Sequence, residues 1–204
     1  MTRDEKRVSI HLPAARMRPD GIINRSVPHM AESISDVAWR EAAAYPRYAT
    51  AAELRRMVAS AQPLDRLRAL WLMRRQIAER GHRPVYFEFA RRLVDDPDND
   101  CRWQALIVAG EFIVTQPEAV WEIVREYGGS PDADMLNGIA CVLLEHLLEH
   151  DFQRFFPRVQ RRARRDRLFG YMVQRCWKFG GSELAANARR LDTLQAWLAR
   201  RERT

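Results

Sequence analysis

Residues 96–110 constrain the fold more than any other stretch of the sequence. They read Asp-Pro-Asp-Asn-Asp-Cys-Arg-Trp-Gln-Ala-Leu-Ile-Val-Ala-Gly, an acidic turn followed by a helix of small and apolar residues. One turn-and-helix unit cannot bury its apolar surface by itself, so such units are stable when neighbouring units stack on them. The stretch therefore predicts an all-α fold built from stacked helical repeats.

The apolar residues from position 31 onward recur with the period of an amphipathic helix. In 84–95, for example, Tyr86, Phe89, Ala90, Leu93 and Val94 form one continuous apolar stripe. This period predicts five antiparallel helix pairs, 31–45 with 50–60, 64–80 with 84–95, 99–115 with 117–127, 131–149 with 152–165, and 167–179 with 183–201.

Proline, serine and glycine residues mark the predicted helix ends. A proline is tolerated at a first helical position, where its missing N–H group costs nothing. Serine side chains cap helix starts, and glycines end helices. We expect first positions at Pro63, Pro84, Pro117 and Pro131, N-caps at Ser130 and Ser182, and helix ends at Gly128-Gly129 and Gly180-Gly181.

The third and fourth predicted pairs align with each other at an offset of 35 residues. The offset places Ala105 on Ala140, Val108 on Leu143, Phe112 on Leu147, Val120 on Phe155 and Val124 on Val159. The first helix of each pair is apolar nearly all round, which predicts that neighbours cover it on several sides. The last helix is one-sided, as a terminal capping repeat requires, with an inward face of Leu184, Leu191, Leu194 and Leu198.

Residues 1–30 differ from the rest because Pro13, Pro19, Gly21 and Pro28 interrupt every helical pattern there. We expect an extended or disordered N-terminal arm ahead of a repeat domain at 31–204, with a short strand possible at Arg7–Leu12. The charged start lacks the apolar stretch of a signal peptide, and no apolar run approaches the ~20 residues of a membrane span. These features predict a cytoplasmic protein that does not enter a membrane.

Residues 96–110 resemble the HEAT repeat in its Asp-Pro-Asp, Val-Arg, Ala-Ala, Leu-Gly variant. The matching residues are Asp96, Pro97, Asp98, Arg102, Ala105 and Gly110, and Cys101 stands where valine is usual. A second repeat, 132–146, matches weakly, because Leu136 or Asn137 stands in place of the arginine. The resemblance implies antiparallel helix pairs stacked into a right-handed α-solenoid, a fold usually used to bind proteins or nucleic acids, and it carries no catalytic residues.

The excess positive charge lies in one segment. The chain has a net charge of +7, and residues 151–178 account for all of it. A row of arginines lies there on one helix face, opposite Phe152, Phe155, Phe156 and Val159, and Pro157 either kinks this helix or marks its first position. The predicted partner-binding residues are Arg154, Arg158, Arg161, Arg162 and Arg165.

Three interpretations of this arginine row remain open. It can be a solvated helix face in an arginine-rich chain, a site for an acidic protein partner, or a site for nucleic acid phosphates. If the HEAT geometry applies, the second helix of each pair lines the concave surface, and the row would project into that groove.

Two enzymatic alternatives have weaker support. Some HEAT-like proteins are DNA glycosylases of the alkylation-repair type, but no Asp or Trp of this chain aligns with their pattern. His146-Leu147-Leu148-Glu149-His150 matches the His-x-x-Glu-His signature of inverted zinc peptidases, in which His146 and His150 would be the metal ligands. The alternative for the same residues, together with Glu145, is a polar helix edge.

The cysteines and tryptophans are interpreted as packing residues. Cys101, Cys141 and Cys176 form no Cys-x-x-Cys pair, and we expect each as a small buried side chain within a helix, rather than as a zinc ligand or catalytic thiol. The tryptophans fall on helical stripes, which favours packing over a base-stacking platform. They are Trp39, Trp71, Trp103, Trp121, Trp177 and Trp197.

Taken together, the sequence predicts a non-enzymatic adaptor without a cofactor. It would bind an acidic protein surface in a basic groove, by electrostatic steering followed by arginine–carboxylate pairs. The alternative is a nucleic-acid-binding protein that uses the same arginines.

Overall fold

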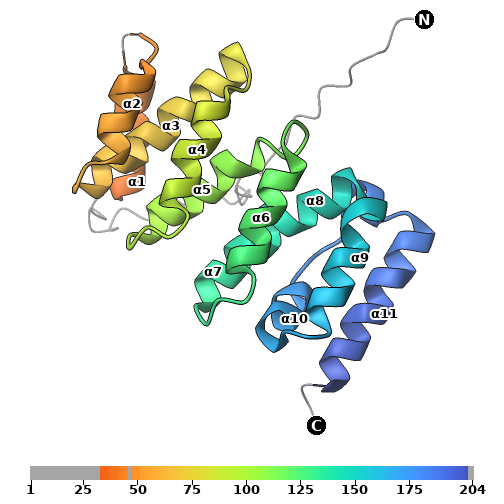
Figure 1. Ribbon diagram of the computed structural model, residues 1–204. Helices are drawn as coiled ribbons and strands as arrows, with labels where there is room; N and C mark the ends of the chain where they lie inside the picture. Colours follow the sequence, from red (N-terminus) through yellow and green to blue (C-terminus); the bar gives the residue numbers. More distant parts are fainter. Residues whose placement is uncertain (1–32, 46, 202–204) are drawn as a thin grey trace, which may run out of the picture. The chain divides into compact units, whose positions relative to one another are not determined.

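A computed structural model of the protein describes residues 33–45 and 47–201, which belong to one compact unit, Glu32–Thr204 (Figure 1). Within these ranges the chain forms helices and no strand. The elements are α1 (Ile34–Ala43), α2 (Ala51–Val58), α3 (Pro63–Arg80), α4 (Pro84–Leu93), α5 (Asn99–Gly110), α6 (Pro117–Tyr127), α7 (Ala133–Gly138), η1 (Ile139–Leu144), α8 (Glu145–His150), α9 (Phe152–Ala163), α10 (Arg167–Gln174), η2 (Gly180–Ser182) and α11 (Ala185–Arg201).

The predicted arm and its strand at Arg7–Leu12 lie outside the described residues, so both stay predictions. None of the helices in the described part of the chain combines the length and the apolar character that crossing a bilayer requires. The prediction of an all-α fold is confirmed for this part of the chain.

Aspartate side chains start three of the helices at a regular interval. Asp98 caps α5, Asp132 caps α7 and Asp166 caps α10, so the caps recur every 34 residues. Each carboxylate accepts a hydrogen bond from a backbone N–H in the first turn, where the positive end of the helix dipole also favours its charge. The helices α5, α7 and α10 therefore begin with the same kind of cap.

Prolines occupy first helical positions at three of the four predicted sites. Pro63, Pro84 and Pro117 begin α3, α4 and α6. The predictions for Pro131 and for Ser130 as an N-cap are wrong, because α7 begins two residues later, at Ala133. Asp132 caps it instead, and its Oδ1 accepts from the N–H groups of Asp134 and Met135.

The glycine predictions hold at one site and fail at the other. Gly128 ends α6, as expected. By contrast, α10 already ends at Gln174, and Gly180, Gly181 and Ser182 form the short helix η2 between α10 and α11. Ser182 is therefore no N-cap of α11, which begins at Ala185. Gly180 has a φ of 45°, which allows the turn into η2.

The segments α7, η1 and α8 follow one another without a break, close to the predicted helix 131–149. The middle segment, η1, is π-helical, and its junctions at Ile139 and Glu145 keep right-handed helical backbone angles. A π-helical turn contains more residues than an α-helical turn, so the residues after η1 face a different direction from the one that a continuous α-helix would give them.

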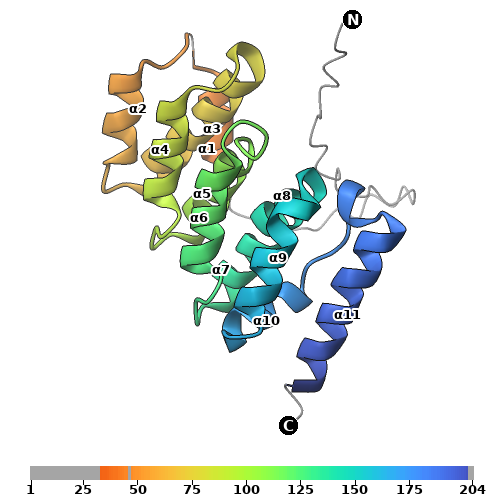
Figure 2. The same ribbon diagram turned by 45° about the vertical axis from the view of Figure 1, so that its right-hand side comes forward.

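The helices pack in chain order (Figures 1 and 2). α1 packs on α3, α3 on α5, and α5 on α7 and η1, while α4 packs on α5 and α6 on η1. Helices α5 and η1 are thus covered on several sides, as their apolar character requires. All ten residues that the 35-residue offset matches, from Ala105 and Ala140 to Val124 and Val159, have fully buried side chains.

Three predicted inward-facing residues are exposed instead. The side chains of Trp39 and Trp177 are 55% and 73% accessible, so the packing interpretation is wrong for these two tryptophans. Leu184 is 64% accessible and precedes α11, because this helix starts later than expected. Leu191, Leu194 and Leu198 do form the buried face of α11.

The cysteine predictions hold in part. Cys101 and Cys176 are buried, and burial raises the pKa of Cys101 to about 12 and that of Cys176 well above 9. Both remain thiols at neutral pH, unlike the thiolates of reactive cysteines. Cys141 is exposed, and Cys176 lies beyond the end of α10 rather than in a helix.

A buried ion pair connects α3 to the turn before α5. The Nε atom of Arg66 lies 2.7 Å from Oδ2 of Asp96, and its Nη2 donates to Oδ1 at 2.9 Å. Arg66 also donates to the carbonyl of Ser60. An equivalent arrangement follows 36 residues later, where Arg102 lies 3.4 Å from Asp132 and 3.6 Å from Asp134. Arg66 of α3 thus contacts the turn before α5, and Arg102 of α5 contacts the turn before α7.

We expect Asp96→Ala to lower the free energy of unfolding by about 3–5 kcal/mol, because it leaves the buried Arg66 guanidinium without a counter-charge. Glu126→Ala is the matched control, since it breaks an exposed ion pair, with Arg91, and should cost no more than about 1 kcal/mol. Urea denaturation followed by circular dichroism measures both. Equal losses in the two variants would contradict a structural role for the buried pair.

Candidate binding cleft

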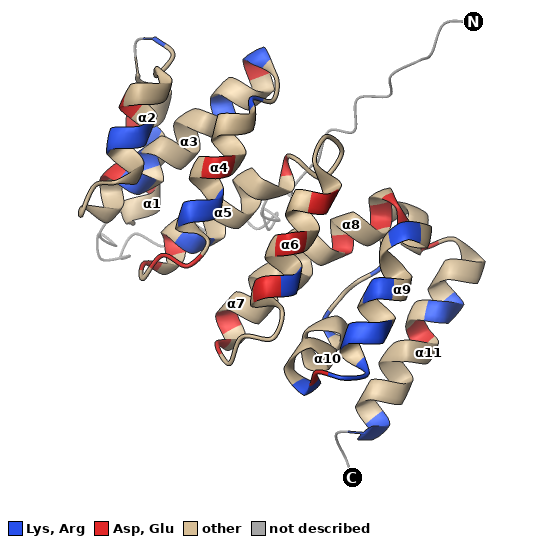
Figure 3. Ribbon diagram, in the orientation of Figure 1, with Lys and Arg blue, Asp and Glu red and all other residues tan. Residues whose placement is uncertain are grey.

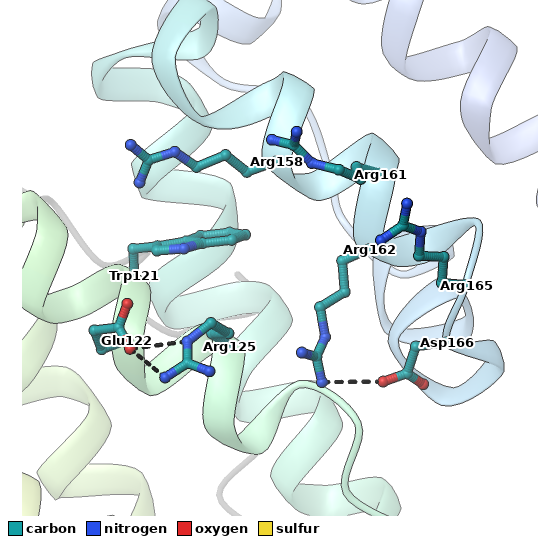
Figure 4. A pocket seen from close by; sticks show the side chains of 8 residues that line it. All are labelled: Trp121, Glu122, Arg125, Arg158, Arg161, Arg162, Arg165 and Asp166. Atoms are coloured by element: carbon teal, nitrogen blue, oxygen red, sulfur yellow. Dashed lines mark hydrogen bonds and ion pairs between the residues drawn. The ribbon is translucent and has the colours of Figure 1, made fainter.

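A cleft of about 570 Å³ opens between α6, α9 and the turn that follows α9 (Figure 4). Its walls come from helices that are separated in sequence but lie side by side in both views of the fold. The residues that line it are Trp121, Glu122, Arg125, Arg158, Arg161, Arg162, Arg165 and Asp166. Five of these eight side chains are guanidinium groups, so the cleft is basic.

Helix α9 presents the arginines because its opposite face is buried. Asp151 caps the helix by accepting from the backbone N–H of Arg154. The core-facing residues are those predicted from the sequence, Phe152, Phe155, Phe156 and Val159. Because this face is buried, the arginine row lies on the opposite face of the helix. Figure 3 shows these basic positions along α9.

Pro157 lies inside α9, five residues after its first residue, Phe152. The interpretation of Pro157 as the first helical position is therefore wrong. Proline has no N–H group, so the carbonyl of Gln153 loses its helical hydrogen bond at this point. The helix continues to Ala163 despite this loss, because its apolar face is held in the core.

Three of the five predicted arginines are already paired with carboxylates. Arg154 and Arg158 share Glu118, at the start of α6, with nitrogen–oxygen distances of 2.7 and 2.6 Å. The hydrogen bond from Arg158, with that from Arg154, holds the pKa of Glu118 below its ordinary value. Arg162 lies 3.1 Å from Asp166. Two carboxylates, Glu118 and Asp166, thus offset two of the three positive charges.

Arg161 and Arg165 differ from the other three. Both side chains are exposed, and neither has an ion-pair or hydrogen-bond partner among the residues that the structure describes. Arg154 does not line the cleft. The structure therefore brings four of the five predicted residues together and leaves two of them with uncompensated charge.

The sequence analysis missed the contribution of α6. Arg125 lines the cleft opposite α9, and its guanidinium is 2.5 Å from Glu122, one turn earlier in the helix. Trp121 is buried at the base of the cleft, with its ring centroid 5.9 Å from that of Phe155. A search for charged residues on the second helix of the preceding pair could have found Arg125.

An acidic stripe runs along α6 beside the cleft. Glu118, Glu122 and Glu126 are spaced by four residues and so lie on one helix face (Figure 3). Each is paired with an arginine, since Glu126 lies 2.7 Å from Arg91 on α4. The cleft therefore has one basic wall and one wall of mixed charge.

The structure places His146 and His150 away from this cleft, on α8. The Nδ1 atom of His146 is 2.8 Å from Oε2 of Glu149, and its ring stacks on Phe179 at 6.1 Å between centroids. His150 is exposed at the end of the helix. In the described part of the chain, no group of three histidine, cysteine or acidic residues is arranged to hold a metal ion.

Glu145 is buried, which corrects its assignment to a polar helix edge. The segment after α10 covers it, and the backbone N–H of Trp177 donates to its Oε1 at 2.7 Å. Burial raises the pKa of Glu145 from an ordinary value of 4.5 to about 7, and the hydrogen bond from Trp177 opposes this shift only in part. The sequence contained no local signal of the burial, because the covering residues lie 32 positions away.

We expect wild-type stability to contain a contribution from Glu145 that decreases as the pH rises from 4.5 to 7. In this window the unfolded chain releases the proton that the folded chain retains, so rising pH favours unfolding. Glu145→Gln removes this contribution. Its free energy of unfolding relative to wild type should increase by up to about 3 kcal/mol across the window, as measured by urea denaturation at several pH values. A constant difference between the two proteins would contradict the raised pKa.

Comparison of the chain with protein-family models, with curated proteins and with solved structures gives no significant match. The geometry of the arginine cleft is therefore the basis on which a function can be argued.

Proposed function

We propose that residues 31–204 form a HEAT-like helical repeat module that binds an acidic segment of a partner protein in the arginine cleft. The observation that carries this proposal is the uncompensated charge of Arg161 and Arg165 at the cleft. Guanidinium groups pair with carboxylates through two parallel hydrogen bonds, which gives both attraction and orientation.

Three features support the HEAT-like part of the proposal. Aspartate caps recur every 34 residues, and the Arg66–Asp96 pair has its counterpart 36 residues later. The first helices of successive predicted pairs also pack on one another. In the proposed solenoid the five antiparallel pairs are α1 with α2, α3 with α4, α5 with α6, the continuous helix from α7 to α8 with α9, and α10 with α11.

The surroundings of the cleft favour a protein segment over nucleic acid. The acidic stripe of Glu118, Glu122 and Glu126 borders the arginines and already occupies the guanidiniums of Arg91, Arg125, Arg154 and Arg158, so the basic surface is short rather than extended. Nucleic acid binding depends on many phosphate contacts along an extended basic surface, whereas within the cleft only Arg161 and Arg165 lack a carboxylate partner among the described residues. A short acidic segment matches this local charge better.

The proposed role is that of a cytoplasmic adaptor that holds a partner without acting on it chemically and without a cofactor. The buried thiols of Cys101 and Cys176 suit a reducing compartment. In this role specificity comes from the charge pattern of the cleft rather than from its apolar area.

We expect Arg161→Glu combined with Arg165→Glu to weaken the binding of a fluorescein-labelled polyglutamate peptide at least about tenfold, because two attractions become repulsions and together exceed about 1.4 kcal/mol. Fluorescence anisotropy at near-physiological salt measures this affinity. The matched control is Arg189→Glu with Arg200→Glu, two exposed arginines of α11 outside the cleft.

Three results would contradict the proposal. They are unchanged binding by the cleft variant, equal losses in both variants, and tighter binding of duplex DNA than of the peptide at this salt concentration. The cleft variant should fold normally, since neither arginine has a partner in the described part of the chain whose loss would destabilise it. Thermal denaturation checks this point.

A further inference from the structure

The uncompensated charge in the cleft has a definite size and place. Of the five lining arginines, Arg125, Arg158 and Arg162 each have a carboxylate within 3.1 Å. The two that remain, Arg161 and Arg165, together carry two positive charges. They are four residues apart, on one side of the end of α9 (Figure 4).

We propose that the cleft recognises a phosphorylated side chain of the partner protein. This inference rests on the proposed function and specifies its ligand. A phosphomonoester carries about −1.5 to −2 charges at pH 7 and presents three acceptor oxygens. One such group can neutralise both guanidiniums and accept hydrogen bonds from each. A single carboxylate carries one charge and is matched by one guanidinium.

The paired arginines hold the site in shape. Arg158 lies over the ring of Phe155, 5.4 Å from its centroid, while its Nη1 donates to Glu118. Arg162 lies over Phe169 at the same distance and is held by Asp166. Asp166 is itself fixed, because its other oxygen caps α10 through the N–H of Phe169. These contacts fix Arg158 and Arg162 beside the two ligand-binding arginines, so the shape of the surrounding wall exists before a ligand arrives.

The same pairs limit how much negative charge the cleft can accept. Glu122 and Asp166 each neutralise one arginine and Glu118 is shared by Arg154 and Arg158, so a second or third phosphate would meet carboxylates beside the guanidiniums. One phosphate on a protein side chain therefore fits better than the repeated phosphates of a nucleic acid or the dense anionic headgroups of a membrane.

Glu122 competes with the ligand. It is 44% accessible, it lines the cleft, and its ion pair and hydrogen bonds within the described part of the chain are with Arg125. Replacing it with glutamine removes one negative charge from the site and releases the Arg125 guanidinium. The variant Glu122→Gln should therefore bind the phosphate more tightly than the wild type, which a purely structural role for this residue would not produce.

The test uses the full chain and three fluorescein-labelled peptides with the same acidic flanks, containing phosphoserine, serine or glutamate at the centre. We expect the phosphopeptide to bind at least about tenfold more tightly than the serine peptide. This gain should fall as the pH drops below about 6, where the phosphate takes up its second proton. Arg161→Gln with Arg165→Gln should abolish the gain, and Arg189→Gln with Arg200→Gln should keep it.

The outcomes separate this inference from the proposed function. If all three peptides bind with similar affinity, the phosphate inference is overturned and the acidic-segment proposal stands. If no peptide binds, both fail. Tighter binding of single- or double-stranded nucleic acid, or of vesicles with anionic lipids, than of the phosphopeptide would also overturn it. A gain that is lost in the cleft variant and increased in Glu122→Gln establishes the site.

Discussion

The buried ion pair between Arg66 and Asp96 constrains how α3 and α5 pack against each other. It joins α3 to the turn that starts α5, and its residues are nearly inaccessible to solvent. A buried arginine and aspartate tolerate only a geometry in which both are paired, because an unpaired buried charge costs several kcal/mol. A longer and more exposed contact of Arg102 with Asp132 and Asp134 connects α5 to the start of α7. The spacing between successive helices is thereby set by charge as well as by apolar packing.

The arginine cleft is a consequence of this stacking. When α6 and α9 lie next to each other, the carboxylates of one helix reach the guanidiniums of the other. Glu118 of α6 pairs with Arg154 and Arg158 of α9, whereas Asp166, in the turn after α9, pairs with Arg162 four residues earlier. Of the row of five arginines, three thus contact carboxylates, and Arg161 and Arg165 have no carboxylate partner among the described residues. This pairing changes the ligand that suits the surface from an extended polyanion to one compact anionic group.

Features that depend on neighbours in sequence could be predicted well. The helix starts at Pro63, Pro84 and Pro117 follow from the missing N–H of proline, and the buried face of α9 follows from its apolar period. Other predictions failed. Gly180-Gly181 and Ser182 resembled helix punctuation but form a separate turn, and Glu145 resembled a surface residue but is covered by the backbone of Trp177. For Glu145 the deciding contact comes from 32 residues away in the chain.

The sequence by itself determined the all-helical character of the described region, the approximate bounds of its helices and the position of the arginine row. These properties arise from local periodicity, capping and charge, which act within a few residues. Only the tertiary structure decided which arginines keep their charge available, that Arg125 and Trp121 belong to the same cleft, and that Cys141 is exposed. Electrostatic pairing and burial depend on distance in space, and Glu118 lies 40 residues from Arg158 along the chain but 2.6 Å from it in the fold.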